Sequence, residues 1–303
     1  MRGKIRVGTA SWSDVEFINT WYPKGLPPAE RLAWYAEHFD LVEINSTFYR
    51  VPSRENVQNW CEQTPDEFLF NVKLHRVLSR HSTAPGFLPP DLRPKAKTKK
   101  EKVIVTPELE EEIADRFMEA VKPFEDTGKM GAFLLQLSPS FSPRTNQIGE
   151  LSHLASCFRG KQLAIELRNR AWLDAKHRRE TEHWFRKNHV TFVMVDGPDD
   201  PHFMVLPSSD AITNPNLAYI RAHGRNAPKY IRGRTVAERF DYDYRIAELK
   251  EMARRAARIV VHTDELHIVF NNNKADYAPK AAERFLQILS AKRAKSRREA
   301  AYA

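Results

Sequence analysis

Eight short apolar segments, separated by segments with helical periodicity, constrain the fold of this 303-residue chain more than any other feature. The apolar segments are Ile5–Thr9, Leu41–Ile44, Phe68–Lys73, Ala132–Leu137, Gln162–Leu167, Thr191–Val195, Ala218–Arg221 and Leu266–Phe270. Apolar residues recur at helical spacing between them, in Pro28–Phe39, Pro107–Phe124, Ile148–Cys157, Thr181–Lys187, Tyr244–Val261 and Pro279–Leu289.

Strands that alternate with helices favour parallel pairing, because a parallel pair needs a long crossover connection. Eight such units predict an α/β fold with a single (β/α)8 TIM-type barrel. A doubly wound sheet is the alternative, but no glycine-rich phosphate fingerprint follows the first strand. We therefore expect one barrel domain over residues 1–290, followed by a basic, disordered tail over residues 291–303.

The basic residues of the chain are concentrated in two segments. The net charge is +9, of which Pro94–Lys102 contributes +4 and Ala291–Ala303 another +4, leaving +1 for the remainder. The first segment lies in Ser82–Lys102, which contains four prolines and predicts a long basic loop or lid inserted after the third strand. Lys95–Lys102 and the tail are candidates for weak, non-specific contact with nucleic acid. The nearly neutral body does not by itself indicate a nucleic-acid enzyme.

Several features predict a cytoplasmic protein with no membrane partner. No apolar run approaches the roughly 20 residues that span a bilayer. The sequence passes from Met1 to Ile5 without an apolar stretch long enough for a signal peptide. Cys61 and Cys157 are far apart in the sequence, and we interpret them as reduced thiols. The sequence does not predict an oligomeric state.

Polar residues alternate with aliphatic ones along several of the predicted strands. Glu43 and Asn45 alternate with Val42 and Ile44, and Glu166 and Arg168 stand between leucines and isoleucine in the same way. Successive side chains of a strand point to opposite faces. If the aliphatic face meets the outer helices, the polar residues point into the barrel near its C-terminal end, where barrel enzymes build their active sites. A register slip of one residue would invert this assignment.

These positions define a candidate site with a balance of acids and bases. The candidate catalytic residues are Glu43, Glu166 and His223, and Asp196 is a further acid. The candidate substrate-binding residues are Asn45, Tyr49, Lys73, His75, Gln136, Arg168, Trp172, Arg221 and Asn271. Balanced charges also fit an ion-paired plug that orients the strands and binds nothing. His75 and Trp172 could equally be core residues.

Several blocks of the sequence resemble one known family. The chain is similar to the YecE-like family, domain of unknown function 72, in Gly8–Trp12, Glu43–Tyr49, Phe68–Lys73, Leu135–Phe141, Glu166–Asn169 with Trp172, Tyr219–Gly224 and Phe270–Asn272. The resemblance implies a TIM-type barrel and no established reaction. Two departures stand out: Ser138 replaces the first residue of a usual double proline, and Pro94–Lys102 is longer and more basic than the family pattern.

The sequence is compatible with three functions. The first is an acid–base enzyme, a hydrolase or lyase, or a binder for a small anionic or phosphorylated ligand. Lys73, Arg168 and Arg221 would hold the anion, and Glu43 or Glu166 with His223 would carry protons. The second is a nucleic-acid-binding or endonuclease-like barrel, and the third a non-catalytic barrel with a structural charge network.

The sequence requires no cofactor and predicts no metal ligands. A divalent metal is the less favoured alternative, because lysine and arginine stand among the acids and there is no HxH or HExxH pattern.

Overall fold

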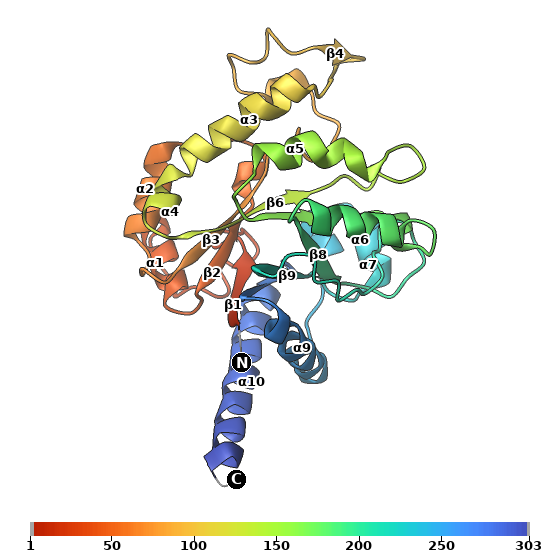
Figure 1. Cartoon of the computed structure of the whole chain (residues 1–303). Helices are drawn as coiled ribbons and strands as arrows, with labels where there is room; N and C mark the ends of the chain where they lie inside the picture. The colour runs from red at the N-terminus through yellow and green to blue at the C-terminus, as the bar shows by residue number, and fades with distance from the viewer. Residues whose placement is uncertain (1–2, 302–303) are drawn as a thin grey trace.

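Eight parallel strands close into a barrel in the computed structural model, which describes residues 3–301 (Figure 1). In order around the barrel they are β1 (Lys4–Ala10), β10 (Glu265–Phe270), β9 (Leu217–Ala222), β8 (Thr191–Asp196), β7 (Leu163–Glu166), β6 (Met130–Gln136), β3 (Leu69–Lys73) and β2 (Leu41–Ile44). Each strand pairs with the next one along the chain, and β10 pairs with β1 to close the barrel. The predicted (β/α)8 architecture is confirmed.

Helices follow the strands and cover the outside of the barrel. They are α1 (Arg31–Ala36), α2 (Arg54–Glu62), α3 (Pro107–Ala120), α4 (Lys122–Asp126), α5 (Ser152–Cys157), α6 (Arg178–Lys187), α7 (Ala227–Arg232), α8 (Val236–Arg239), α9 (Ile246–Ile259) and α10 (Tyr277–Ala301). Short 3-10 turns lie at Pro28–Glu30, Ser46–Phe48, Pro85–Phe87, Ile148–Leu151, Arg170–Leu173 and Val260–His262.

Helix α2 lies in a segment where the sequence pattern does not predict a helix. Ser53 caps its N-terminus by accepting a hydrogen bond from the backbone N–H of Asn56, and the helix buries Val57 and Cys61 at helical spacing. Polar residues occupy most of its remaining positions, so its apolar stripe is short.

The eight strands bury residues on both faces, and the two faces differ in character. Val42, Ile44 and Val72 point outward and pack in the large cluster formed with the helices. The inner face carries a separate apolar cluster of Ala10, Leu41, Leu69, Leu134, Ala164, Val193, Tyr219 and Val269. The strand registers inferred from the alternation of residues are therefore correct. This inner layer fills the barrel below the polar residues described next.

The Ser82–Lys102 insertion lies between β3 and α3 and contains a small hairpin of β4 (Thr98–Lys99) and β5 (Lys102–Val103). Its two-residue turn, Lys100 and Glu101, has φ of 50° and 59°, the left-handed conformation of a type I′ hairpin turn. Figure 1 shows this hairpin beyond the first turns of α3.

Helix α10 packs against β1 and β10 through its first turns, where Ala278, Ala281 and Phe285 are buried. Its backbone then continues away from the barrel to Ala301 (Figure 1). For residues 291–303 the sequence led us to expect a disordered tail. The structure instead gives helix over residues 291–301, and the last two residues lie outside the described part of the chain.

Candidate functional site

Polar side chains replace apolar ones at the carboxyl ends of five strands. Each lies two positions after a residue of the inner apolar cluster and therefore on the same, inward face. The pairs are Leu41 and Glu43, Leu134 and Gln136, Ala164 and Glu166, Tyr219 and Arg221, and Val269 and Asn271. The parallel strands thus bring these polar groups together at one end of the barrel.

Arg221 is the centre of this polar layer and is completely buried. Its Nε donates to Glu43 Oε2 at 3.0 Å, its Nη2 donates to Glu43 Oε1 at 2.6 Å, and its Nη1 donates to Glu166 Oε2. The Tyr219 hydroxyl donates to Glu43 Oε2 at 2.7 Å. Burial disfavours the charged guanidinium, but the two carboxylates outweigh burial and raise the pKa of Arg221. This triad, Arg221 with Glu43 and Glu166, is a buried ion network in which each charged group has an oppositely charged partner.

Glu166 links this triad to a histidine. Its Oε1 accepts from Gln136 Nε2 at 2.9 Å and lies 3.2 Å from His223 Nε2, while His223 Nδ1 lies 2.9 Å from the Asn271 amide nitrogen. With that amide donating to Nδ1, His223 carries its proton on Nε2 and donates to Glu166. Burial lowers the pKa of His223 against the opposing effect of Glu166, so the neutral ring is favoured. For Glu166, burial raises the pKa, but the charge of Arg221 and the hydrogen bond from His223 outweigh it and hold the pKa well below the ordinary value.

Lys73 ends β3 on the inward face and behaves differently from these paired groups. Its Nζ lies 4.8 Å from the centre of the Phe48 ring, and among the described residues it has no carboxylate within 4.0 Å. Burial, followed by the charge of Arg221, lowers the pKa of the Lys73 ammonium to about 7, although Glu43 and Glu166 oppose the shift. A substantial fraction of Lys73 is therefore a neutral amine at physiological pH.

A cavity of about 540 Å³ opens above the polar layer, and Lys73 forms part of its wall. Its size is within the range of small-molecule sites, and its position is that of the active sites of TIM barrels. It is lined by Asp14, Val15, Glu16, Asn45, Phe48, Tyr49, Lys73, His81, Gln136, Arg168, Thr235, Ala237, Arg239, Phe240, Asn271 and Asn273. The cavity is not lined by Glu43, Glu166, Arg221 or His223, whose side chains lie in the polar layer beneath it.

Two of the predicted binding residues reach the cavity with unsatisfied polar atoms. The Nε of Arg168 is buried, has no hydrogen-bond partner within residues 3–301, and lies 4.0 Å from Glu166 Oε1. The Oδ1 of Asn45 is likewise buried without a partner in that range. Tyr49 stands at the rim, 57% exposed. Both residues line the cavity, and each keeps one buried polar atom without a hydrogen-bond partner in the described range.

Three candidate residues lie away from the cavity. His75 Nε2 is hydrogen-bonded to the Phe87 carbonyl at 3.1 Å and faces a different pocket, beside the insertion. Trp172 is buried against Phe141, to whose carbonyl its indole N–H donates at 2.9 Å. Asp196 is held by Arg225 at 2.7 Å and by the Tyr244 hydroxyl at 2.8 Å. Strand alternation predicts that His75 shares the inward face of Lys73, but β3 ends at Lys73 and His75 lines a different pocket. Trp172 serves as a core residue under its loop.

Several cavity residues that the sequence did not predict lie outside the strands. Among them, Asp14, His81, Arg239 and Phe240 come from the segments after β1, β3 and β9, and Arg239 ends α8. Burial and the nearby charges of Arg168 and Lys73 lower the pKa of His81 to about 4, so this ring is neutral at physiological pH. The rule that loops after barrel strands build the site could have identified Asp14 and His81. Arg239 lies too far beyond its strand for the same signal.

The described residues contain no group of three or more histidine, cysteine, aspartate or glutamate side chains placed to hold a metal ion. No helix in the described range is long and apolar enough to cross a membrane.

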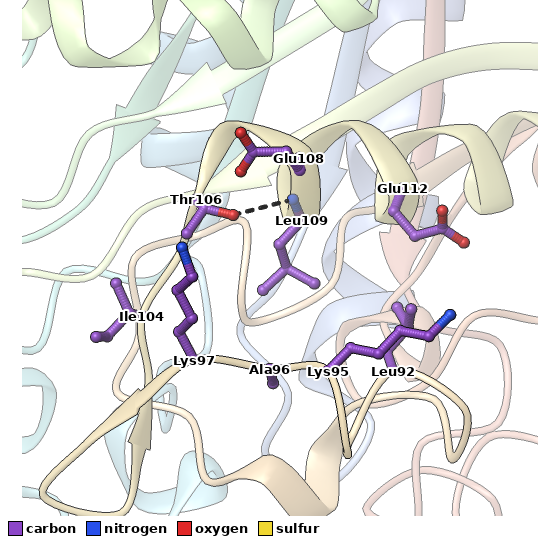
Figure 2. A pocket seen from close by; sticks show the side chains of 9 residues that line it. All are labelled: Leu92, Lys95, Ala96, Lys97, Ile104, Thr106, Glu108, Leu109 and Glu112. Atoms are coloured by element: carbon purple, nitrogen blue, oxygen red, sulfur yellow. Dashed lines mark hydrogen bonds between the residues drawn. The ribbon is translucent and has the colours of Figure 1, made fainter.

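The lysine-rich segment lies apart from the barrel mouth and contributes no residue to the cavity there. Figure 2 shows Lys95 and Lys97 beside the first turn of α3, where the Thr106 side chain accepts a hydrogen bond from the backbone N–H of Leu109 at 3.3 Å. The five lysines between residues 95 and 102 are all exposed. The segment is therefore not a lid over the mouth, and contact with nucleic acid stays a prediction for it.

Comparisons with known proteins agree with this architecture. A family model described as "Protein of unknown function DUF72" matches residues 6–302. The chain is 24% identical over 289 residues to UPF0759 protein YunF of Bacillus subtilis, covering 94% of each protein. It is 26% identical to UPF0759 protein YecE of Escherichia coli K12 over 166 residues, 54% of this chain and 48% of that protein.

Two solved structures extend the comparison to the fold. A DUF72 family protein of Thermotoga maritima MSB8 superposes with a TM-score of 0.76 at 26% identity, covering 95% of this chain and 99% of that one. A DUF72 family protein of Enterococcus faecalis V583 gives 0.77 at 25% identity, covering 94% and 95%.

Proposed function

The chain belongs to the DUF72 family, whose description assigns no activity, and on that premise we propose that it binds a small anionic ligand in the cavity at the barrel mouth and acts on it by acid–base chemistry. The observation that carries the proposal is the cationic side chains of the cavity wall, Lys73, Arg168 and Arg239. Arg168 lies 4.0 Å from Glu166 Oε1 without a hydrogen bond from its Nε, and Lys73 has no carboxylate within 4.0 Å among the described residues.

The charges around the cavity explain why an anion fits it. Beneath the cavity, Glu43 and Glu166 both pair with Arg221, and Arg168 lies 4.0 Å from Glu166 as a second cation. The two acids of the wall are also engaged: Asp14 accepts from Asn273 at 3.0 Å, and Glu16 pairs with Lys274 at 3.2 Å. The remaining groups of the wall are cationic, namely Lys73, Arg168 and Arg239. Guanidinium groups bind carboxylates and phosphates through paired hydrogen bonds, and a bound anion would complete the charge balance.

Lys73 is the group best suited to move protons in this cavity. General acid–base catalysis is most effective when the pKa of the group lies near the working pH, and the pKa of Lys73 lies at about 7. Glu43 and Glu166 lie below the cavity floor, so in this proposal they act as positioning residues that set the charge around Lys73. His223 and Asn271 hold Glu166 in place from the other side.

Thermal denaturation with and without inorganic phosphate and small carboxylates tests the proposal. We expect anions to raise the melting temperature of the wild type and to have little effect on Arg168→Gln. Arg144→Gln, a change of an exposed arginine outside the cavity, is the matched control and should respond like the wild type. Equal stabilisation of all three proteins would place the anion elsewhere and refute the proposal.

A further inference from the structure

We propose that Lys73 is a nucleophile that forms an imine with a ligand carrying both a carbonyl group and an anionic group, such as a 2-oxo acid or a keto phosphate. This inference rests on the proposed function, because the anionic group is the part of the ligand that Arg168 would hold. It goes further by assigning a covalent step and a substrate class.

A comparison with a second buried lysine shows how unusual the surroundings of Lys73 are. Lys129 is 4% exposed, and its Nζ donates to the Cys61 carbonyl at 2.6 Å, the Thr64 carbonyl at 2.6 Å and the Thr64 hydroxyl at 3.3 Å. All three of its protons have acceptors, so its role is structural. Lys73 has instead an aromatic ring at 4.8 Å and the cavity, with no such acceptor among the described residues. Its amine is therefore free to react.

The surroundings of Lys73 also favour the reactive form of the amine. Lysine nucleophiles are activated by burial in apolar surroundings and by neighbouring cations. Lys73 has both, because burial is the largest cause of its lowered pKa and the charges of Arg221 and Arg168 lower it further. The lone pair of Lys73 is thus available at neutral pH.

The remaining wall groups fit the steps of imine formation. The Nζ lone pair attacks the carbonyl carbon, and the electrons of the carbon–oxygen π bond pass to the oxygen. Transfer of a proton from nitrogen to oxygen gives a carbinolamine. Loss of hydroxide gives the iminium ion. Its N–H proton and the departing hydroxide combine to form water, so that amine and carbonyl become imine and water. The side chains of Gln136, Asn271 and Asn45 line the same cavity as Lys73 and supply amide groups to its wall.

Borohydride trapping tests this assignment with two matched pairs of probes. Pyruvate is compared with lactate, and dihydroxyacetone phosphate with glycerol 3-phosphate; in each pair only the first compound has a carbonyl. We expect reduction to leave a covalent adduct on Lys73, located by peptide mass spectrometry, with pyruvate or dihydroxyacetone phosphate. The two alcohols should leave none. The pair that gives the adduct distinguishes a carboxylate from a phosphate as the anionic group.

Two controls separate this inference from the proposed function. Lys73→Arg keeps a cation in the wall but cannot form an imine, so it should give no adduct, while the stabilisation of the wild type by inorganic phosphate is the separate readout of anion binding. Lys129 serves as the internal control and should remain unmodified. Adducts spread over exposed lysines without enrichment at Lys73, in a protein that phosphate stabilises, would refute the imine and leave anion binding intact. If phosphate does not stabilise the wild type either, both proposals fail.

Discussion

Replacing Arg221 with methionine removes the cation from the centre of the buried network. Glu43 and Glu166 would keep their positions at 0% and 1% exposure, but each would lose its hydrogen bonds to the guanidinium. Methionine is long enough to fill much of the space and contributes no hydrogen-bond donor. The change therefore isolates the electrostatic effect of leaving two carboxylates together in a barrel interior.

The size of the effect follows from the burial of the pair. Removing one partner of a buried ion pair typically costs about 3–5 kcal/mol, because the remaining charge stays buried without compensation. Here two carboxylates lose the same partner, so we expect a loss at the upper end of that range. The loss should shrink in acid, because protonation removes both unpaired charges from the variant. In the wild type, by contrast, the lowered pKa of Glu166 gives stabilisation that is fully present above pH 4.5 and is lost progressively as the pH falls from there through the folded-state pKa.

Urea unfolding of the two proteins at neutral and acidic pH measures this difference. A triple variant that combines Arg221→Met with Glu43→Gln and Glu166→Gln provides the rescue. Neutral side chains of similar size often replace a buried ion network at little cost, so the triple variant should recover much of the lost stability. The reasoning is refuted if Arg221→Met loses less than about 1 kcal/mol, the value typical of an exposed ion pair. A triple variant no more stable than the single one would also refute it.

Three further predictions concern neighbouring features. The pKa of Lys73 is about 7 in the folded chain against 10.5 ordinarily. Between pH 7 and pH 10.5 the unfolded chain therefore binds more protons than the folded chain, so the free energy of unfolding rises with pH. From pH 7 to pH 9 the wild type should gain at most about 2 kcal/mol relative to Lys73→Met in urea unfolding; a pH-independent difference would contradict this. Glu166→Gln should abolish ligand turnover with near-ultraviolet circular dichroism unchanged; full activity excludes Glu166 from the mechanism, and unfolding indicates a structural plug. Deleting Ala291–Ala303 should remove weak DNA retention, and retention that survives at physiological salt would locate the contacts elsewhere.

The barrel and its polar layer could be predicted from the sequence because both depend on the alternation of residues along strands. Leu41 and Glu43, or Ala164 and Glu166, share a face in any strand, and parallel pairing brings their carboxyl ends to one end of the barrel. The alternation fails where a strand ends. Lys73 is the last residue of β3, so the direction of the His75 side chain depends on a turn that the pattern does not encode.

The walls of the cavity were harder to predict, because they come from loops whose course depends on tertiary contacts. Arg239 and Phe240 follow β9 by many residues and reach the mouth at the end of α8, which contributes to the cavity wall. The pairing of each charge was also beyond the sequence. The sequence supplies three acidic and three basic candidates, whose charges balance. Only the structure shows that Arg221 forms ion pairs with both glutamates and that Lys73 has no ion-pair partner among the described residues.

The measurement that tests the account most directly is an NMR titration of the Lys73 side chain in lysine-labelled protein, with and without inorganic phosphate. Loss of the signal in Lys73→Arg assigns it. We expect a midpoint at about 7 in the free protein and a higher midpoint with phosphate, because a bound anion favours the ammonium form. An ordinary lysine midpoint, or one that saturating phosphate does not move, would contradict the account.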